Sequence, residues 1–177
     1  PIPSRGLGDV YKRQGVNRWK FSNIYSLSIG QGELLVTPIQ MANLAAIIAN
    51  RGFYYNPNIV LEIGNEKVPE SDINQVNISS KHFEYVVNAM EEVVMSGSAR
   101  RGFQKDLELC GKTSTVENPF GYDHSGFIGF APKANPKIAI AAYIENSGWG
   151  GRAAASISSL VAEKFINKEI KRTWLED

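Results

Sequence analysis

The stretch Ile138-Ala139-Ile140-Ala141-Ala142-Tyr143-Ile144 decides the fold that we expect for this chain. Its side chains alternate between two faces if it forms a β-strand, and both faces are then apolar. A strand that is apolar on both faces must be covered on both faces, so helices have to pack on each side of its sheet. The sequence therefore predicts an α/β (α+β) architecture in which helices sandwich a sheet.

Two further strands are expected shortly before this one, at residues 107–116 and 125–131. The connecting segments, 117–124 and 132–137, are shorter than the dozen or so residues that a crossover between parallel strands needs. The three strands should therefore form an antiparallel meander.

Three helices are expected around the sheet. Thr37-Pro38-Ile39-Gln40 predicts a helix start, because threonine can cap, proline suits the first helical position and glutamine can complete a capping box. Six apolar residues recur at the spacing of one helix face and predict a second helix: Phe83, Val86, Val87, Met90, Val93 and Val94. A closing helix is expected at 152–171, and a polar surface loop at 64–77. One face of this closing helix is expected to pack against the core, and it carries Ala153, Ile157, Leu160, Val161 and Phe165.

Composition limits the classes of function. The formal net charge is +1. Nucleic-acid binding would need a basic face, and nothing in the sequence indicates one. Cys110 is the single cysteine, so no internal disulfide forms, and most cysteines in such a setting are small buried apolar residues. One alternative pairs Cys110 as a thiol nucleophile with His124 as its base. One cysteine and two histidines do not indicate a metal site.

Residues 1–14 differ in character from the rest of the chain. The segment Asp9-Val10-Tyr11-Lys12-Arg13-Gln14 is similar to one translated frame of a transposon end that is used in sequencing libraries. We expect residues 1–14 to be an adapter artefact or else a disordered arm, and residues 15–177 to belong to one domain.

The segment Gly111-Lys112-Thr113-Ser114-Thr115 carries the most chemical information. In a strand, Lys112 and Ser114 share one face while Thr113 and Thr115 share the other. A cation, hydroxyl groups and unpaired backbone N–H groups suit an edge strand that receives an anionic acyl substrate.

In its context this segment resembles class B penicillin-binding proteins, most closely the penicillin-binding protein 2 type, over residues 15–171. The resemblance implies the penicillin-binding/serine β-lactamase-like transpeptidase fold, here incomplete, and no cofactor. The matching segments are Leu27-Ser28-Ile29-Gly30-Gln31-Gly32, Thr37-Pro38-Ile39-Gln40-Met41-Ala42, Gly111-Lys112-Thr113-Ser114-Thr115-Val116-Glu117-Asn118-Pro119, Asp123-His124-Ser125, Phe130-Ala131-Pro132 and Ile144-Glu145-Asn146.

The resemblance also implies roles for individual residues. Lys112 would supply positive potential to the nucleophile and the substrate carboxylate, Thr113 would bind that carboxylate, and the backbone N–H of Thr115 would form half of an oxyanion hole. Ser114 stands where the family has glycine, and His124 would help to shape the substrate site. The activity implied is cross-linking of peptidoglycan stem peptides by a D,D-transpeptidase that also binds β-lactams. The implied setting is a membrane-anchored protein with a periplasmic catalytic domain and a membrane glycosyltransferase partner.

The family's nucleophile motif, Ser-x-x-Lys, and its Ser-x-Asn (or Ser-x-Asp) motif have no match at any serine of this chain. We therefore expect a C-terminal fragment of the transpeptidase domain that is inactive by itself. Two other functions stay open from the sequence: a serine β-lactamase-like hydrolase, and a non-catalytic module that binds peptide or β-lactam, which Ser114 would favour.

Overall fold

The computed structural model describes residues 21–32, 35–69 and 71–172. The chain divides into two compact units, residues 1–37 and 38–177. In the first unit, helix α2 (Phe21–Ser28) ends in a turn at Gly30, whose N–H donates to the Leu27 carbonyl at 3.0 Å. The segment 1–14, expected to be an artefact or an arm, lies outside the described residues, and that expectation stays a prediction.

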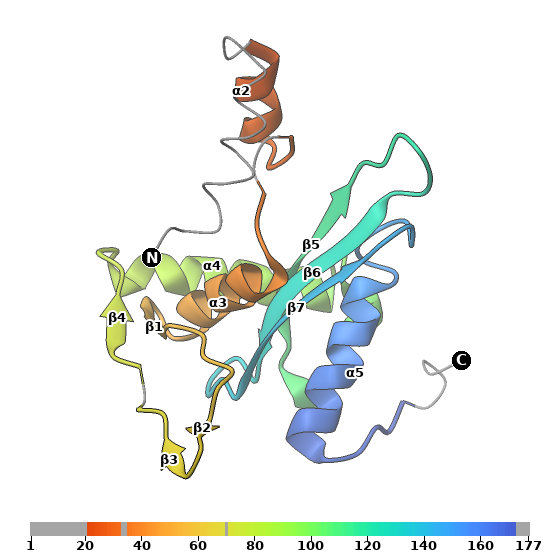
Figure 1. Ribbon diagram of the computed structural model, residues 1–177. Coiled ribbons are helices and arrows are strands. Elements are labelled where there is room, and N and C mark those ends of the chain that lie inside the picture. The colour runs from red at the N-terminus through yellow and green to blue at the C-terminus, as the bar shows by residue number, and fades with distance from the viewer. Residues whose placement is uncertain (1–20, 33–34, 70, 173–177) are drawn as a thin grey trace. The chain divides into compact units, whose positions relative to one another are not determined.

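The second unit is built on a three-stranded antiparallel sheet (Figure 1). Its strands are β5 (Cys110–Val116), β6 (His124–Ala131) and β7 (Ile138–Ile144), and β6 lies between the other two. The predicted meander is confirmed. The first strand begins three residues later than expected, because Lys105–Leu107 form a 3-10 turn (η2) and Glu108 takes a left-handed conformation with a φ of 47°.

Helices cover both faces of this sheet, as the apolar character of β7 on both faces predicted. Helices α3 (Pro38–Ala49) and α4 (Ser80–Met95) lie on one side, and α5 (Ala154–Asn167) lies on the other (Figure 1). Side chains alternate along β6, so its residues pack against the helices on both faces of the sheet. Phe130 packs with Val87 and Met90 of α4, whereas Phe127 belongs to the cluster that holds the small residues of α5.

The start of helix α3 is also as expected. Helix α3 begins at Pro38, directly after the threonine. Helix α4 buries four residues of the predicted stripe, Phe83, Val87, Met90 and Val94. Of the other two, Val93 is half-buried and Val86 is exposed. A second 3-10 turn, η1 (Arg100–Gly102), follows α4 and leads the chain toward β5.

The prediction for the closing helix was wrong in both its extent and its buried face. Helix α5 ends at Asn167, since Lys168 is left-handed with a φ of 64°. Ile157, Val161 and Phe165 of the expected stripe are 47%, 48% and 48% exposed. Small and polar side chains allow α5 to approach the sheet and η1 closely, which the count of large apolar residues could not show. The buried residues of α5 are Ala154, Ala155, Ser158, Ser159, Ala162 and Glu163.

The loop expected at 64–77 contains two short strands that the sequence did not indicate. Strand β4 (Ile73–Gln75) pairs with β1 (Phe53–Tyr55), which follows α3, and β3 (Glu66–Lys67) pairs with β2 (Glu62–Ile63). Strands of two or three residues carry almost no periodic signal, and their pairing depends on tertiary context.

A buried ion pair joins Arg172, which follows α5 in the chain, to Glu163 of that helix. Arg172 Nε donates to Glu163 Oε2 at 2.9 Å, and both side chains are almost completely buried. The guanidinium also donates to Ser159 Oγ at 2.8 Å and to the Gly102 carbonyl of η1 at 3.4 Å. This latch (Glu163, Arg172, Ser159 and Gly102) fixes the connection between η1 and α5.

Candidate active-site wall

The predicted site segment lies on β5, at the edge of the sheet. Among the residues that the structure describes, no strand pairs with the outer side of β5. Lys112, Ser114 and Thr115 are exposed, and Thr113 is half-buried. Backbone groups along this outer edge are therefore available to an extended ligand, as in recognition by strand addition.

The side chains of this segment divide between the two faces as predicted. Thr113 and Thr115 lie on the side of α5. Thr113 Oγ1 is 2.7 Å from Ser98 Oγ, and Thr115 Oγ1 accepts a hydrogen bond of 3.3 Å from the Gly150 N–H. Lys112 and Ser114 lie on the other face, and Lys112 Nζ donates to the Thr113 carbonyl at 2.7 Å. No carboxylate in the described part of the chain forms an ion pair with Lys112. Its charge is therefore available to an anionic ligand.

The turn between β7 and α5 passes directly against this wall. A Cβ on Gly150 would lie 2.1 Å from the Ser114 carbonyl oxygen, so only glycine fits there. The buried Ser125 Oγ donates to the Trp149 carbonyl at 3.3 Å and accepts from the Ala154 N–H at 3.0 Å. Sequence reasoning missed Ser98, because nothing in its local sequence shows that it meets β5, and it did not foresee the hydrogen bonds of Ser125 to this turn.

His124 lies at the same end of the sheet as Thr115. It opposes Val116 in the register, and therefore shares the face of Lys112 and Ser114. Its Nδ1 accepts a hydrogen bond of 3.0 Å from the Asn146 N–H, which fits the neutral tautomer with the proton on Nε2. The ring of Tyr143 is 5.5 Å away, and desolvation, then the charge of Glu145, raises the pKa of that phenol. The imidazole is thus held in one orientation beside the wall.

Cys110 is remote from His124, which excludes the alternative of a thiol nucleophile with a histidine base. Cys110 opposes Phe130 and His124 opposes Val116, so six strand residues separate the pairs, or about 20 Å. Burial, followed by the nearby charge of Glu91, raises the pKa of the Cys110 thiol to about 12. The expectation of a small buried residue is confirmed.

Ser114 sits opposite Gly126 of β6. A Cβ on Gly126 would lie only 2.0 Å from Ser114 Oγ. The missing side chain on β6 therefore makes the room that the additional hydroxymethyl group on β5 occupies.

This fit leads to a prediction for a pair of substitutions. Gly126→Ala should destabilise the domain by about 1–3 kcal/mol through overpacking, while Ser114→Gly alone should be within about 1 kcal/mol of the unaltered protein. The double variant should recover most of the loss, because the clashing hydroxyl is gone. Urea unfolding of the intact protein measures all three. Equal losses in the single Gly126→Ala and double variants would show that the two positions are not coupled.

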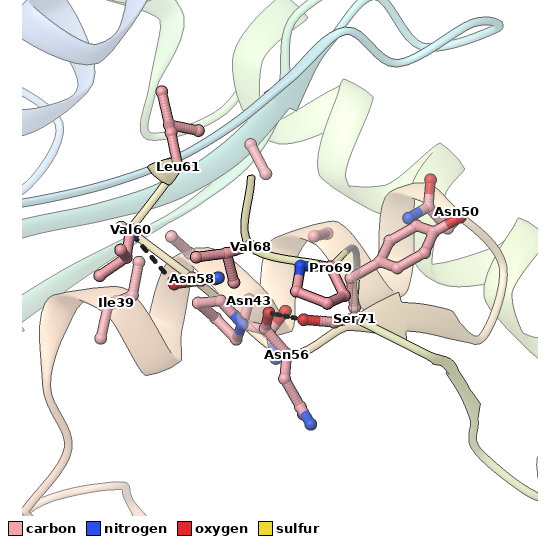
Figure 2. Close-up of a pocket in the computed structure, with 15 residues that line it drawn as sticks. Ile39, Asn43, Asn50, Asn56, Asn58, Val60, Leu61, Val68, Pro69 and Ser71 are labelled. Atoms are coloured by element: carbon pink, nitrogen blue, oxygen red, sulfur yellow. Dashed lines mark hydrogen bonds between the residues drawn. The ribbon is translucent and has the colours of Figure 1, made fainter. Parts of the chain in front are cut away.

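A separate pocket of the described residues lies away from this wall. It has a volume of about 550 Å³ and opens between α3 and residues 55–71. Figure 2 shows Ile39, Val60 and Val68 around it, and Asn58 accepts a hydrogen bond of 2.9 Å from the Val60 N–H. From the sheet it is lined by Ala139, which opposes Phe130 and so lies at the Cys110 end of the strands. It is therefore separate from the Lys112–Thr115 wall.

No group of three or more histidine, cysteine, aspartate or glutamate side chains in the described residues could hold a metal ion. No helix within the described ranges is both long and apolar enough to cross a bilayer.

Comparison with known proteins places this chain in a family. Residues 4–164 match the penicillin binding protein transpeptidase domain. The peptidoglycan D,D-transpeptidase MrdA of Acinetobacter baumannii is 32% identical over 179 residues, covering 87% of this chain and 26% of that protein. The chain belongs to the penicillin-binding protein transpeptidase family, as the sequence motifs indicated.

Solved structures agree with this assignment. The crystal structure of Pseudomonas aeruginosa PBP2 in complex with WCK 5153 matches with a TM-score of 0.75 and 27% identity, over 94% of this chain and 38% of that one. A structure described as the structural coordination of polymerization and crosslinking by a peptidoglycan synthase complex matches with a TM-score of 0.71 and 28% identity, over 92% of this chain and 29% of that one. The predicted transpeptidase fold is confirmed, and the chain spans between a quarter and two-fifths of the length of these relatives.

Proposed function

We propose that the protein containing this chain is a peptidoglycan D,D-transpeptidase that acts through a serine acyl-enzyme and binds β-lactams. The observation that carries the proposal is the exposed edge strand β5, which presents Lys112, Thr113 and Thr115 with no competing strand among the described residues. In this proposal the chain provides one wall of the active site. A serine outside these 177 residues provides the nucleophile, since none here lies in a Ser-x-x-Lys motif.

In the proposed reaction, the serine oxygen attacks the carbonyl carbon of the D-alanyl-D-alanine bond. The C–N bond breaks, and D-alanine leaves with the proton that the serine gave up. The amine of a second stem peptide then attacks the ester, forms the cross-linking amide and returns a proton to the serine. Lys112 and Thr113 bind the terminal carboxylate, and the Thr115 N–H donates to the carbonyl oxygen as negative charge develops on it.

His124 and Ser114 have supporting roles in this proposal. His124 is held by the Asn146 N–H and lines the substrate side of the wall, without acting as the general base. Ser114 lies over Gly126 and stands where the family is expected to have glycine.

The setting proposed is that of an elongation-type penicillin-binding protein. We expect a membrane-anchored protein whose catalytic domain is periplasmic and which works with a membrane glycosyltransferase. Support for the partner comes from the likeness to a structure whose description names polymerization and crosslinking in one synthase complex. A function without catalysis is the second candidate, favoured by Ser114 alone.

Release of D-alanine from a stem pentapeptide by the intact protein tests this proposal. The expected result is D-alanine release together with an amide cross-linked dimer, and both should be blocked by penicillin. Hydrolysis of β-lactams with rapid turnover and no dimer would favour a β-lactamase-like hydrolase. Reversible binding of peptide with neither product would favour the non-catalytic module.

A further inference from the structure

The pocket between α3 and residues 55–71 has no part in the proposed reaction. Its volume of about 550 Å³ lies in the range of small-molecule sites, roughly 300–1,000 Å³. None of the side chains that line it is charged. Four are asparagines, one is a serine, one is a tyrosine, and the rest are aliphatic. We call it the amide pocket after its asparagines, Asn43, Asn50, Asn56 and Asn58.

One wall of the amide pocket is a single face of α3. Five lining residues recur at the spacing of that face: Ile39, Ala42, Asn43, Ala46 and Asn50. Ala46 lies between Asn43 and Asn50 on this face, and its small side chain leaves room between the two amides. Both asparagines are half-buried, and within the described residues neither side-chain amide has a hydrogen-bond partner. Such amides gain when a ligand supplies the missing hydrogen bonds.

The opposite wall, residues 55–71, presents side chains and not a free strand edge. The Val60 N–H donates to Asn58 Oδ1 at 2.9 Å, and Ser71 Oγ donates to the Asn56 carbonyl at 3.2 Å. A peptide that binds by strand addition needs unpaired backbone groups, and these are already paired. The Nδ2 group of Asn58 stays available as a donor. Recognition at this wall therefore depends on side-chain amides.

The lining favours an uncharged ligand that carries amides and hydroxyl groups. A charged group would lose hydration here without meeting an opposite charge. The nearby Glu62 and Lys67 oppose each other in the β2–β3 hairpin and do not line the pocket. An asparagine side chain has both donors and an acceptor, so it can pair with an acetamido group or a hydroxyl. The aliphatic residues and the half-exposed ring of Tyr55 suit the C–H face of a sugar ring.

The polar groups are distributed along the pocket. In Figure 2, Asn50 and Leu61 lie toward opposite ends, and Asn43 and Asn58 lie between them in this view. Leu61 is 82% exposed and provides an apolar rim at its end. A chain of sugar units, each with its own hydrogen-bonding groups and its own apolar face, matches this distribution better than a ligand with a single polar group.

We infer that the amide pocket binds N-acetylated sugar units of a glycan chain. The inference goes beyond the proposed function, since it rests on the lining of the pocket and not on the reaction. In the strand register Ala139 of the lining is level with Cys110, five residues or about 17 Å from the level of Thr115. A glycan bound here raises the local concentration of its stem peptides near the Lys112–Thr115 wall without occupying that wall.

The test uses the intact protein and three uncharged ligands. Chitotetraose consists of N-acetylglucosamine units, cellotetraose has a hydroxyl in place of each acetamido group, and an alanine tetrapeptide with blocked ends has amides but no sugar rings. Chitotetraose should bind with a Kd of about 1 mM or tighter. Cellotetraose should bind about tenfold more weakly, because it lacks the acetamido groups that pair with the asparagines. The peptide should show no measurable binding. Calorimetry measures the Kd values.

Substitutions locate the binding in the amide pocket. Asn43→Leu and Asn50→Leu each remove one amide and should weaken chitotetraose binding about five- to tenfold, the loss expected for one or two neutral hydrogen bonds. The matched control is Asn88→Leu, the same change at an exposed position of α4 outside the lining, which should leave binding unchanged. The midpoint of urea unfolding checks that each variant folds. With two pocket variants, one that fails to fold leaves the other to decide.

Three outcomes would overturn the inference. The first is equal affinity for chitotetraose in the folded pocket variants and in Asn88→Leu. The second is equal affinity of the unaltered protein for chitotetraose and cellotetraose, or no saturable binding of either. The third is tighter binding of the alanine peptide, which would make the pocket a peptide site. Since binding is measured without turnover, failure of D-alanine release overturns the proposed function and leaves the glycan site standing.

Discussion

Lys112→Ala in the intact protein is expected to slow acylation by penicillin about 10²–10³-fold. At 4 Å, two unit charges attract by about 4 kcal/mol at an effective dielectric near 20, and the exposure of Lys112 reduces that figure. Each 1.36 kcal/mol is a factor of ten in rate, so a loss of about 3–4 kcal/mol gives this range. No other described cation lies in the segment 110–116 to replace the lost charge. The second-order rate of acylation is the quantity to measure.

Ser114→Gly is the matched control on the same face of β5. If the serine is a tolerated replacement for glycine, this variant should be acylated at an equal or modestly higher rate. If Ser114 instead blocks the nucleophile, the change should raise acylation from a near-zero baseline, as expected for a non-catalytic module. Lys112→Ala as fast as the unaltered protein would remove Lys112 from the mechanism.

Glu163→Gln is expected to destabilise the domain by about 3–5 kcal/mol. The substitution leaves the Arg172 guanidinium buried with no charge partner, and an uncompensated buried charge is costly. Arg172→Met should cost a similar amount for the converse reason. The double variant should cost less than the sum of the two, because both charges are then gone. Urea unfolding of the intact protein measures these losses. The midpoint and slope of each transition give the free energy of unfolding of the two single variants and the double variant.

The matched control for this prediction is a neighbouring pair on the surface. Lys171 Nζ lies 3.9 Å from Glu169 Oε1, and both side chains are mostly exposed. Glu169→Gln should change the free energy of unfolding by less than about 0.5 kcal/mol, as is usual for exposed pairs. A comparable loss in Glu163→Gln and Glu169→Gln would show that the latch does not stabilise the fold.

The core of the fold could be predicted because its signals are local. The apolar faces of β7 and the short links on either side of β6 sufficed for an antiparallel sheet between helices. The buried face of α5 could not be predicted in the same way. Which face of α5 is buried depends on which residues let the helix approach η1. Ser159 and Glu163 are buried there with hydrogen-bond partners from distant parts of the chain, Gly102 and Arg172.

In the candidate site, too, features with a local signal could be predicted and features that depend on tertiary contacts could not. Lys112, Thr113, Ser114 and Thr115 are consecutive, so strand alternation alone predicted their two faces. Ser98 and Gly150 are distant from them in sequence, and no local pattern indicates that they contact β5. The partner of Ser114 was also hidden, because the register that places Gly126 opposite it is a property of the assembled sheet.

Labelling with a fluorescent penicillin, followed by denaturing electrophoresis, tests the central claim most directly. The intact protein and the chain of residues 1–177 are compared at equal concentration. We predict a covalent band on the intact protein and none on residues 1–177, because these residues provide the wall that binds the carboxylate but no serine in a Ser-x-x-Lys motif. A band on residues 1–177 that survives denaturation, or no band on the intact protein, would contradict the proposed role of this wall.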